Sequence, residues 1–384
     1  MKAKRIVLPI LIAATTIAAV ALLILISVRN GLLWNLMSQR TPKSLERGAN
    51  LCWCSLNGSD LRNQADKVLT YGFNLRTRWP KAGLLPPGFE PGQVLTNAMN
   101  PGLGIRELHR QGITGKGVSV AIIDYPLIGR HPEYADHVAA NHQVRGASGA
   151  SMHGPAVASL LVGRHCGTAP DASLYYVAVP DPGKDASEHA EALDWLIERN
   201  RALPDKEKIR VVSVSSAASG SGSPYRNGRA WDEAVARAEK TGVLVVDGTL
   251  HHGFIRPCNL DPQAPDDVSR CQPIPTQKGF NLFNGRLMVP VAPRTVAEEY
   301  STHEQGYRYC GWMDHTLGMF GTSWSMPYCA GVLALGWQVN PDVPAPRMKQ
   351  LLFESAFVRP DGVKVINPKA FIAAVKQEQG QVRK

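Results

Sequence analysis

The chain has 384 residues, of which 44% are hydrophobic and 19% are charged, and its formal net charge is +10. The apolar fraction is typical of a packed globular protein and excludes a wholly disordered chain. No dense run of Lys and Arg is interleaved with aromatic residues, so the charge does not indicate nucleic-acid binding. The excess positive charge either favours anionic surfaces such as lipid headgroups or serves solubility alone.

An uncharged stretch near the N-terminus is long enough to cross a lipid bilayer. Residues 6–28 contain no charged side chain over 23 positions, after Lys2, Lys4 and Arg5 and before Arg29. A membrane-spanning helix needs roughly 20 residues, and no small-x-small cleavage site follows the stretch. We therefore predict an uncleaved single-pass membrane anchor through residues 6–28. The short basic tail predicts that the rest of the chain is extracytoplasmic.

Domain boundaries follow from changes in sequence texture. Residues 1–29 form the predicted tail and anchor. Residues 30–100 have weak periodicity and many turn residues, which indicates a linker or an irregular pro-region. Residues 101–384 are predicted to form one domain, because such a length suits a single large α/β unit.

Seven cysteines agree with an oxidising compartment. Cys258 and Cys271 flank a segment rich in Pro and Asp, and their spacing predicts a disulfide that closes this loop. The odd total leaves at least one thiol free. Neither a CxxC pair nor a grouped Cys/His spacing occurs, so no metal site is predicted.

From residue 101 onward, short apolar runs alternate with helical patterns. Strands are expected at 118–124, 173–179, 209–215, 243–247 and 286–291, and helices at 153–163, 186–201, 229–241, 323–339, 345–357 and 368–377. This rhythm predicts an α/β fold, with a mostly parallel, doubly wound sheet that carries helices on both faces. In such sheets, ligands bind beyond the carboxyl ends of the strands.

Three residues with catalytic side chains fall in positions from which they can meet. Asp124 ends an apolar strand, His153 opens a helix in MHGPAVASLLVG, and Ser323 opens another in FGTSWSMPYCAGVLAL. Taken singly, each has an ordinary structural explanation as a turn former or a helix cap. Together they supply what peptide hydrolysis requires: a nucleophile, a base that deprotonates it and a group that orients the base.

These segments, in the order Asp, His, Ser, resemble the active-site blocks of the subtilisin-like serine peptidases. The family pattern around the nucleophile is close to G-T-S-M-A-T-P-H-x-A-G, and residues 321–331 read GTSWSMPYCAG. His153-Gly154 and the Ala169-Pro170 turn match the second block. The resemblance spans about residues 105–345. It implies the subtilisin-like fold, a catalytic triad of Asp124, His153 and Ser323, and peptide or protein substrates.

The same resemblance implies further site residues. Thr249 stands where the family usually has the Asn of the oxyanion hole, so its hydroxyl and the Ser323 amide would bind the oxyanion. Residues 211–215 resemble the edge strand that holds the substrate backbone. The predicted substrate-binding residues are Ser213, Val214, Ser215, Ser216 and Ala217. No cofactor is required for the chemistry. Calcium often stabilises the family, but no acidic loop locates a site.

The sequence also departs from the family pattern. Tyr125 and Pro126 follow Asp124 where the family has Thr or Ser and then Gly, and Trp324 enlarges the position next to Ser323. Two functions therefore stay open. The first is a membrane-anchored serine endopeptidase. The second is a catalytically impaired relative that acts as a membrane-held peptide-binding module.

Overall fold

The computed structural model describes residues 41–382 apart from ten gaps, at 52–53, 75–76, 150–152, 181–184, 216–224, 250, 262–263, 274–284, 292–310 and 313–321. The predicted anchor, residues 6–28, lies outside the described residues. Within the described part of the chain, no helix is both long and apolar enough to span a membrane. The chain divides into two compact units, Met1–Phe89 and Glu90–Lys384, so the boundary falls inside the segment predicted as a linker.

The described part of the first unit, residues 41–89, packs around a core of its own. It contains α3 (Ala65–Val68), β1 (Phe73–Asn74) and the 3-10 turn η1 (Ala82–Leu84). Its fully buried side chains include Leu51, Leu56, Leu61, Tyr71 and Phe73. The Phe73 ring lies 4.9 Å from that of Trp79 in an edge-to-face contact. These residues therefore form a packed unit, although their sequence indicates an irregular segment.

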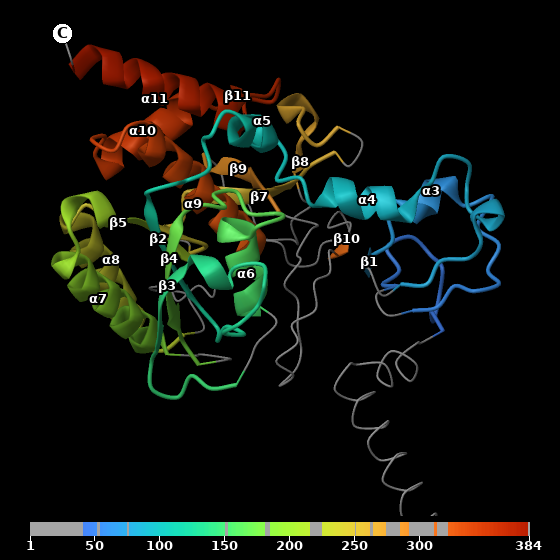
Figure 1. Ribbon diagram of the computed structural model, residues 1–384, viewed down its shortest axis with the longest axis horizontal. Coiled ribbons are helices and arrows are strands. Elements are labelled where there is room, and N and C mark those ends of the chain that lie inside the picture. The colour runs from blue at the N-terminus through green and yellow to red at the C-terminus, as the bar shows by residue number, and fades with distance from the viewer. Residues whose placement is uncertain are drawn as a thin grey trace, which may run out of the picture. The chain divides into compact units, whose positions relative to one another are not determined.

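In the part of the second unit that the structure describes, the largest feature is a parallel sheet of five strands (Figure 1). Its order is β3-β4-β2-β5-β6, with bounds β2 Ser119–Asp124, β3 Val138–Gln143, β4 Ser173–Ala178, β5 Ile209–Val214 and β6 Leu244–Asp247. All six residues of β2 are buried, as expected for a central strand covered on both faces. The sheet confirms the predicted α/β fold. Strand β3 was not predicted, because its sequence VAANHQ has no apolar run.

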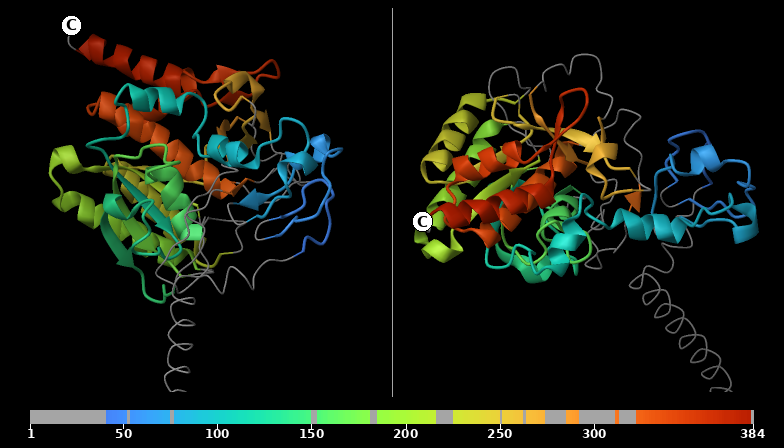
Figure 2. Two further views of the ribbon diagram at one scale, coloured as in Figure 1. Left: turned by 45° about the vertical axis from the view of Figure 1, so that its right-hand side comes forward. Right: turned by 90° about the horizontal axis from the view of Figure 1, so that it is seen from above.

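Helices cover both faces of this sheet (Figures 1 and 2). On one face Val120 and Ile122 share a core with α6 (His153–Val162) and α9 (Thr322–Val339). On the other face Ala121 and Ile123 share a core with α7 (Ala186–Ala202) and α8 (Gly228–Lys240). Because side chains alternate across a strand, β2 contributes to both cores. Its carboxyl end is thereby held between two packed layers.

A second sheet accompanies the first, in the order β11-β12-β9-β7-β8. Its strands are β7 (Ile255–Asn259), β8 (Gln272–Pro273), β9 (Leu287–Pro290), β11 (Phe357–Val358) and β12 (Lys364–Val365). The predicted strand at 286–291 therefore belongs to this sheet and not to the main one. The remaining elements are α4 (Pro91–Ala98), α5 (Ile105–Arg110), η2 (Ala135–His137), η3 (Asp205–Glu207), η4 (Val268–Arg270), β10 (Gly311–Trp312), α10 (Ala345–Glu354) and α11 (Pro368–Val382).

The disulfide predicted between Cys258 and Cys271 does not form, although both side chains are buried. The register explains this result. Cys258 of β7 lies opposite Pro273 of β8, which places Cys271 two positions further along and diagonal to Cys258. Diagonal neighbours are about 7–8 Å apart, whereas disulfide-bonded Cβ atoms are about 3.5–4.5 Å apart.

Candidate active site

Asp124 and His153 form a direct hydrogen bond at the carboxyl end of β2. His153 Nδ1 lies 2.6 Å from Asp124 Oδ1, and the same oxygen accepts the Tyr125 amide at 2.8 Å. Asp124 is 0% exposed. Because the carboxylate only accepts hydrogen bonds, this contact assigns the imidazole proton to Nδ1 and leaves Nε2 as the basic atom. The pair thus has the arrangement of a base and its orienting group.

The close approach of α6 to the end of β2 requires a glycine beside His153. A Cβ on Gly154 would lie 2.2 Å from the Tyr125 carbonyl oxygen and 2.5 Å from the Tyr176 hydroxyl. That hydroxyl donates a hydrogen bond to the same carbonyl. The His-Gly sequence is therefore a steric requirement of this junction, since it lets the first turn of α6 place the imidazole against Asp124.

The His153 ring contacts two aromatic rings. Its centroid lies 5.5 Å from that of Tyr125 and 5.1 Å from that of Trp324, and its side chain is 20% exposed. Both aromatic residues depart from the family pattern. Aromatic rings attract cations, so these two rings would favour a protonated His153 side chain. They also restrict the orientation of the imidazole.

Ser323 lies in the first turn of α9 and is half-buried. Its carbonyl oxygen accepts a hydrogen bond of 2.8 Å from the hydroxyl of Ser215, the residue that follows β5. The Ser325 hydroxyl donates to the Val289 carbonyl at 3.0 Å and ties the same turn to β9. Because Trp324 contacts His153, the start of α9 lies beside the Asp–His pair. The three predicted triad residues are therefore at one edge of the sheet.

Thr249 does not present its hydroxyl proton to this edge. The hydroxyl donates to Asp247 Oδ1 at 2.8 Å, and its oxygen accepts the His252 amide at 3.1 Å. Thr249 is buried, with 3% exposure. A hydroxyl has a single proton to donate, and here a buried carboxylate takes it. In this arrangement the predicted oxyanion role of the Thr249 hydroxyl is not supported, whereas the Ser323 amide lies in the open first turn of α9.

A buried polar cluster around Asp247 was not predicted from the sequence. Trp231 Nε1 donates to Asp247 Oδ2 at 2.9 Å, and Thr249 donates to the other oxygen. Burial raises the pKa of Asp247, and these hydrogen bonds oppose the rise. Nearby, His252 Nε2 lies 2.7 Å from Asp232 Oδ1. One sequence feature could have indicated this cluster, because Asp247 ends an apolar strand as Asp124 does.

Strand β5 is not an edge strand, which corrects the prediction for the substrate-binding residues. Val214 pairs with Ile123 of β2 on one side and with Asp247 of β6 on the other. Ser213 and Val214 are fully buried. Their backbone groups are used within the sheet and cannot hold a substrate strand. Ser215, just beyond β5, is half-buried, and Ser216 and Ala217 lie outside the described residues.

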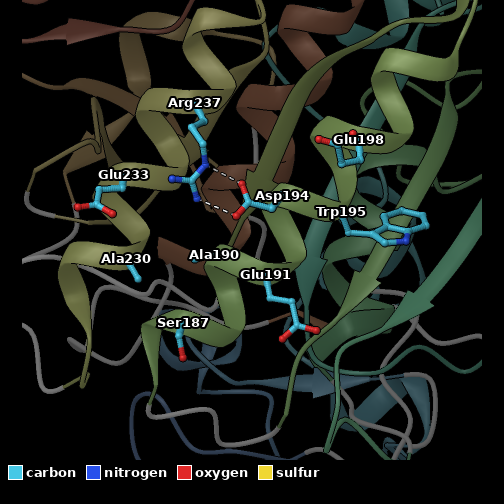
Figure 3. Close-up of a pocket in the computed structure, with 9 residues that line it drawn as sticks. All are labelled: Ser187, Ala190, Glu191, Asp194, Trp195, Glu198, Ala230, Glu233 and Arg237. Carbon is cyan, nitrogen blue, oxygen red and sulfur yellow. Dashed lines mark hydrogen bonds and ion pairs between the residues drawn. The ribbon is translucent and has the colours of Figure 1, made fainter.

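Elsewhere in the second unit, a wide groove of about 570 Å³ runs between α7 and α8 (Figure 3). Acidic side chains dominate its lining: Glu191, Asp194, Glu198 and Glu233, with Arg237 bonded to Asp194 at 2.9 and 2.7 Å. Of the predicted site residues that the structure describes, none lines this groove. Among the residues that the structure describes, no group of three His, Cys, Asp or Glu side chains could hold a metal ion.

Comparisons with known proteins agree with this architecture. The family model described as the subtilase family matches residues 115–247, a range that contains Asp124 and His153. The subtilisin-like protease PopC of Myxococcus xanthus is 26% identical over 286 residues, which cover 67% of this chain and 59% of PopC. The serine protease AprX of Bacillus subtilis is 25% identical over 292 residues, covering 64% of this chain and 63% of AprX. The matches thus span about three fifths of these relatives.

Among solved structures, the prenylagaramide maturation protease PagA is similar to this chain with a TM-score of 0.50. The two are 16% identical, and the similarity covers 71% of this chain and 98% of PagA. At this identity the likeness concerns the fold alone. It agrees with the arrangement of a parallel sheet between two layers of helices.

Proposed function

Because this chain belongs to the subtilisin-like serine peptidase family, we propose that it is an endopeptidase whose triad is Asp124, His153 and Ser323. The observation that carries the proposal is the 2.6 Å bond between His153 Nδ1 and the buried Asp124 carboxylate. This bond leaves Nε2 available as a base, and the start of α9, which carries Ser323, adjoins the imidazole. The substrates are peptides or proteins.

In the proposed reaction, His153 Nε2 takes the proton of the Ser323 hydroxyl as its oxygen attacks the peptide carbonyl. The imidazolium then gives this proton to the departing amine, and an ester on Ser323 remains. Water, deprotonated by the same nitrogen, hydrolyses the ester and restores the free serine. Asp124 stabilises the imidazolium in both steps. The chemistry uses side chains and water only, so we propose that it requires no cofactor.

The tetrahedral intermediates carry a negative oxygen that needs hydrogen-bond donors. We assign the backbone amide of Ser323 to this role, because amides in the first turn of a helix are free to donate and the helix dipole favours negative charge there. The Thr249 hydroxyl donates to Asp247 instead. Lack of one oxyanion donor typically lowers turnover by about 10²–10³, so we expect a slow peptidase. An extended substrate would lie beyond β5, from Ser215 onward.

A second function is favoured by the same Thr249 contact. If the intermediate is too poorly stabilised for turnover, the chain would bind peptides without cleaving them. Labelling with a fluorophosphonate, which reacts with activated serines, distinguishes the two functions. If the chain is a peptidase, the probe labels the wild-type protein but neither the Ser323→Ala nor the His153→Ala variant. A folded wild-type protein that does not label, with or without residues 30–100, would support the binding module.

We also propose that residues 6–28 anchor the chain as a single pass, with the peptidase domain extracytoplasmic. The support is the uncharged length of this stretch and the basic residues before it. Alkaline carbonate extraction of membranes tests the anchor. The full chain should stay in the pellet, and a chain lacking residues 1–29 should enter the supernatant. Release of the full chain would contradict the anchor.

A further inference from the structure

A small basic pocket lies at the amino ends of β2 and β5. It has a volume of about 220 Å³, and four cationic side chains line it: Lys116, Lys206, Lys208 and Arg210. The strands are parallel, and their carboxyl ends carry Asp124 and lead to Ser215. The pocket is therefore at the opposite edge of the sheet from the candidate active site, and the proposed peptidase reaction does not use it.

The positive charges of this pocket are not neutralised by the protein. Within the described residues, none of the four cations forms an ion pair with a carboxylate. Among the residues that the structure describes, no acidic side chain lines the pocket, and the nearest in sequence, Asp205 and Glu207, are exposed on η3. Like charges around a small volume repel one another. An anion that enters the pocket would lower this repulsion.

The walls of the pocket are held in place by hydrogen bonds. Lys208 Nζ donates to the carbonyl oxygens of Asn200 and Arg201 at 2.8 and 3.2 Å, at the end of α7. Trp337 is 2% exposed, and its indole N–H donates to the Val343 carbonyl at 3.0 Å. These bonds hold the Lys208 ammonium group and the Trp337 ring in place before any ligand binds. A preformed site loses less entropy on binding.

Gln338 is equally committed to the protein. Its side-chain oxygen accepts the amides of Thr114 and Gly115, each at 2.7 Å, and its nitrogen donates to the Gly112 carbonyl at 2.8 Å. The polar side-chain groups of Gln338 thus already have partners within the protein. Lys116, Lys206 and Arg210 are the other cationic residues that line the pocket.

We propose that this pocket binds a phosphate or diphosphate group. Several converging Lys and Arg side chains are the usual partners of phosphate oxygens. The volume equals that of about seven water molecules, which admits one or two phosphoryl groups with some water. The phosphate belongs either to a free anion or to a lipid headgroup, and the two sources share this recognition chemistry.

Calorimetric titration of the detergent-solubilised full chain with inorganic pyrophosphate at low ionic strength tests the site. The test variant is Lys206→Gln/Arg210→Gln. The control is Arg130→Gln/Arg145→Gln, which removes the same charge from exposed positions after the carboxyl ends of β2 and β3. We expect the dissociation constant to rise at least about tenfold in the test variant, since each lost charge-assisted bond contributes substantially, and less than about twofold in the control.

Equal weakening in both variants would show that net charge alone attracts the anion and would overturn the proposal. Absence of binding to the wild type at millimolar pyrophosphate would overturn it too. Thermal unfolding checks that the variants fold. If the double variant does not fold, Lys116→Gln, on an exposed turn, takes its place as the test variant. Dihexanoyl phosphatidic acid, used below its micelle concentration, separates the sources. If this lipid binds more tightly than inorganic phosphate, the ligand is a lipid headgroup. If the two bind equally, the ligand is a free anion. Either outcome supports a phosphate site in the pocket.

Discussion

Replacing Asp124 by Asn removes a charge from the proposed triad and leaves the shape of the side chain. Asp124 Oδ1 lies 2.6 Å from His153 Nδ1, which sets the two charge centres roughly 4 Å apart when the imidazole is protonated. At an effective dielectric constant of about 20, this attraction is about 4 kcal/mol. It is present only when His153 has accepted the serine proton. Its loss should therefore slow attack by Ser323 about 10³-fold.

The rate constant for fluorophosphonate labelling measures this step without a known substrate. Asp232→Asn is the matched control, because Asp232 also bonds a histidine, with 2.7 Å between its Oδ1 and His252 Nε2. We expect the control to label within about threefold of the wild type. Asp124→Asn should keep the fold, because the amide oxygen can still accept hydrogen bonds from His153 Nδ1 and the Tyr125 amide. Asp124 Oδ2 is buried and has no hydrogen-bond partner among the described residues, so the variant exchanges one unpartnered polar group for another.

Two results would refute this reasoning. If Asp124→Asn labels within tenfold of the wild type while Ser323→Ala does not label, Asp124 does not stabilise the imidazolium. If the Asp232 variant slows as much as the Asp124 variant, the loss is not specific to the triad. Circular dichroism and urea unfolding of each variant exclude a loss of structure as the cause.

The remaining predictions concern the residues around His153 and helix α7, which follows β4. Trp324→Ala should slow labelling about three- to thirtyfold, since its ring favours the imidazolium; an unchanged rate would exclude this role. Gly154→Ala should lower the free energy of unfolding by about 1–3 kcal/mol or more, because the new Cβ meets a backbone carbonyl at 2.2 Å. Gly83→Ala, with no atom within 4 Å of the new Cβ, is the control in urea unfolding, and equal effects would contradict the steric argument. Hydrogen bonds from Ser187 lower the pKa of Asp185, at the start of α7, from 3.8 to about 2. Because the folded pKa is the lower one, the stabilisation is present above pH 3.8 and is lost as the pH falls towards 2. Asp185→Asn should therefore weaken the fall of the urea unfolding midpoint between about pH 4 and pH 2. If the midpoint of the variant falls with pH as steeply as that of the wild type, the predicted contribution of Asp185 is wrong.

The fold class and the order of the candidate triad could be read from the sequence because their signals are local. Apolar runs such as 118–124 predict buried strands, and the Asp, His and Ser motifs each occupy one short segment next to a strand end or a helix start. The rule that functional groups gather at the carboxyl ends of parallel strands then brings the segments together. The core of residues 41–89 escaped prediction because it is built from irregular chain with little periodicity.

What the tertiary structure decided concerns pairings between distant residues. The neighbours of β5 depend on strand order, so its place between β2 and β6 could not be read from residues 211–215. That Cys258 and Cys271 form no disulfide follows from strand register, not from their separation along the chain. The Thr249 proton is donated to Asp247 only because β6 and the following turn bury both side chains together. Local sequence thus predicts which elements form, whereas register and strand order determine which polar groups are left for a substrate.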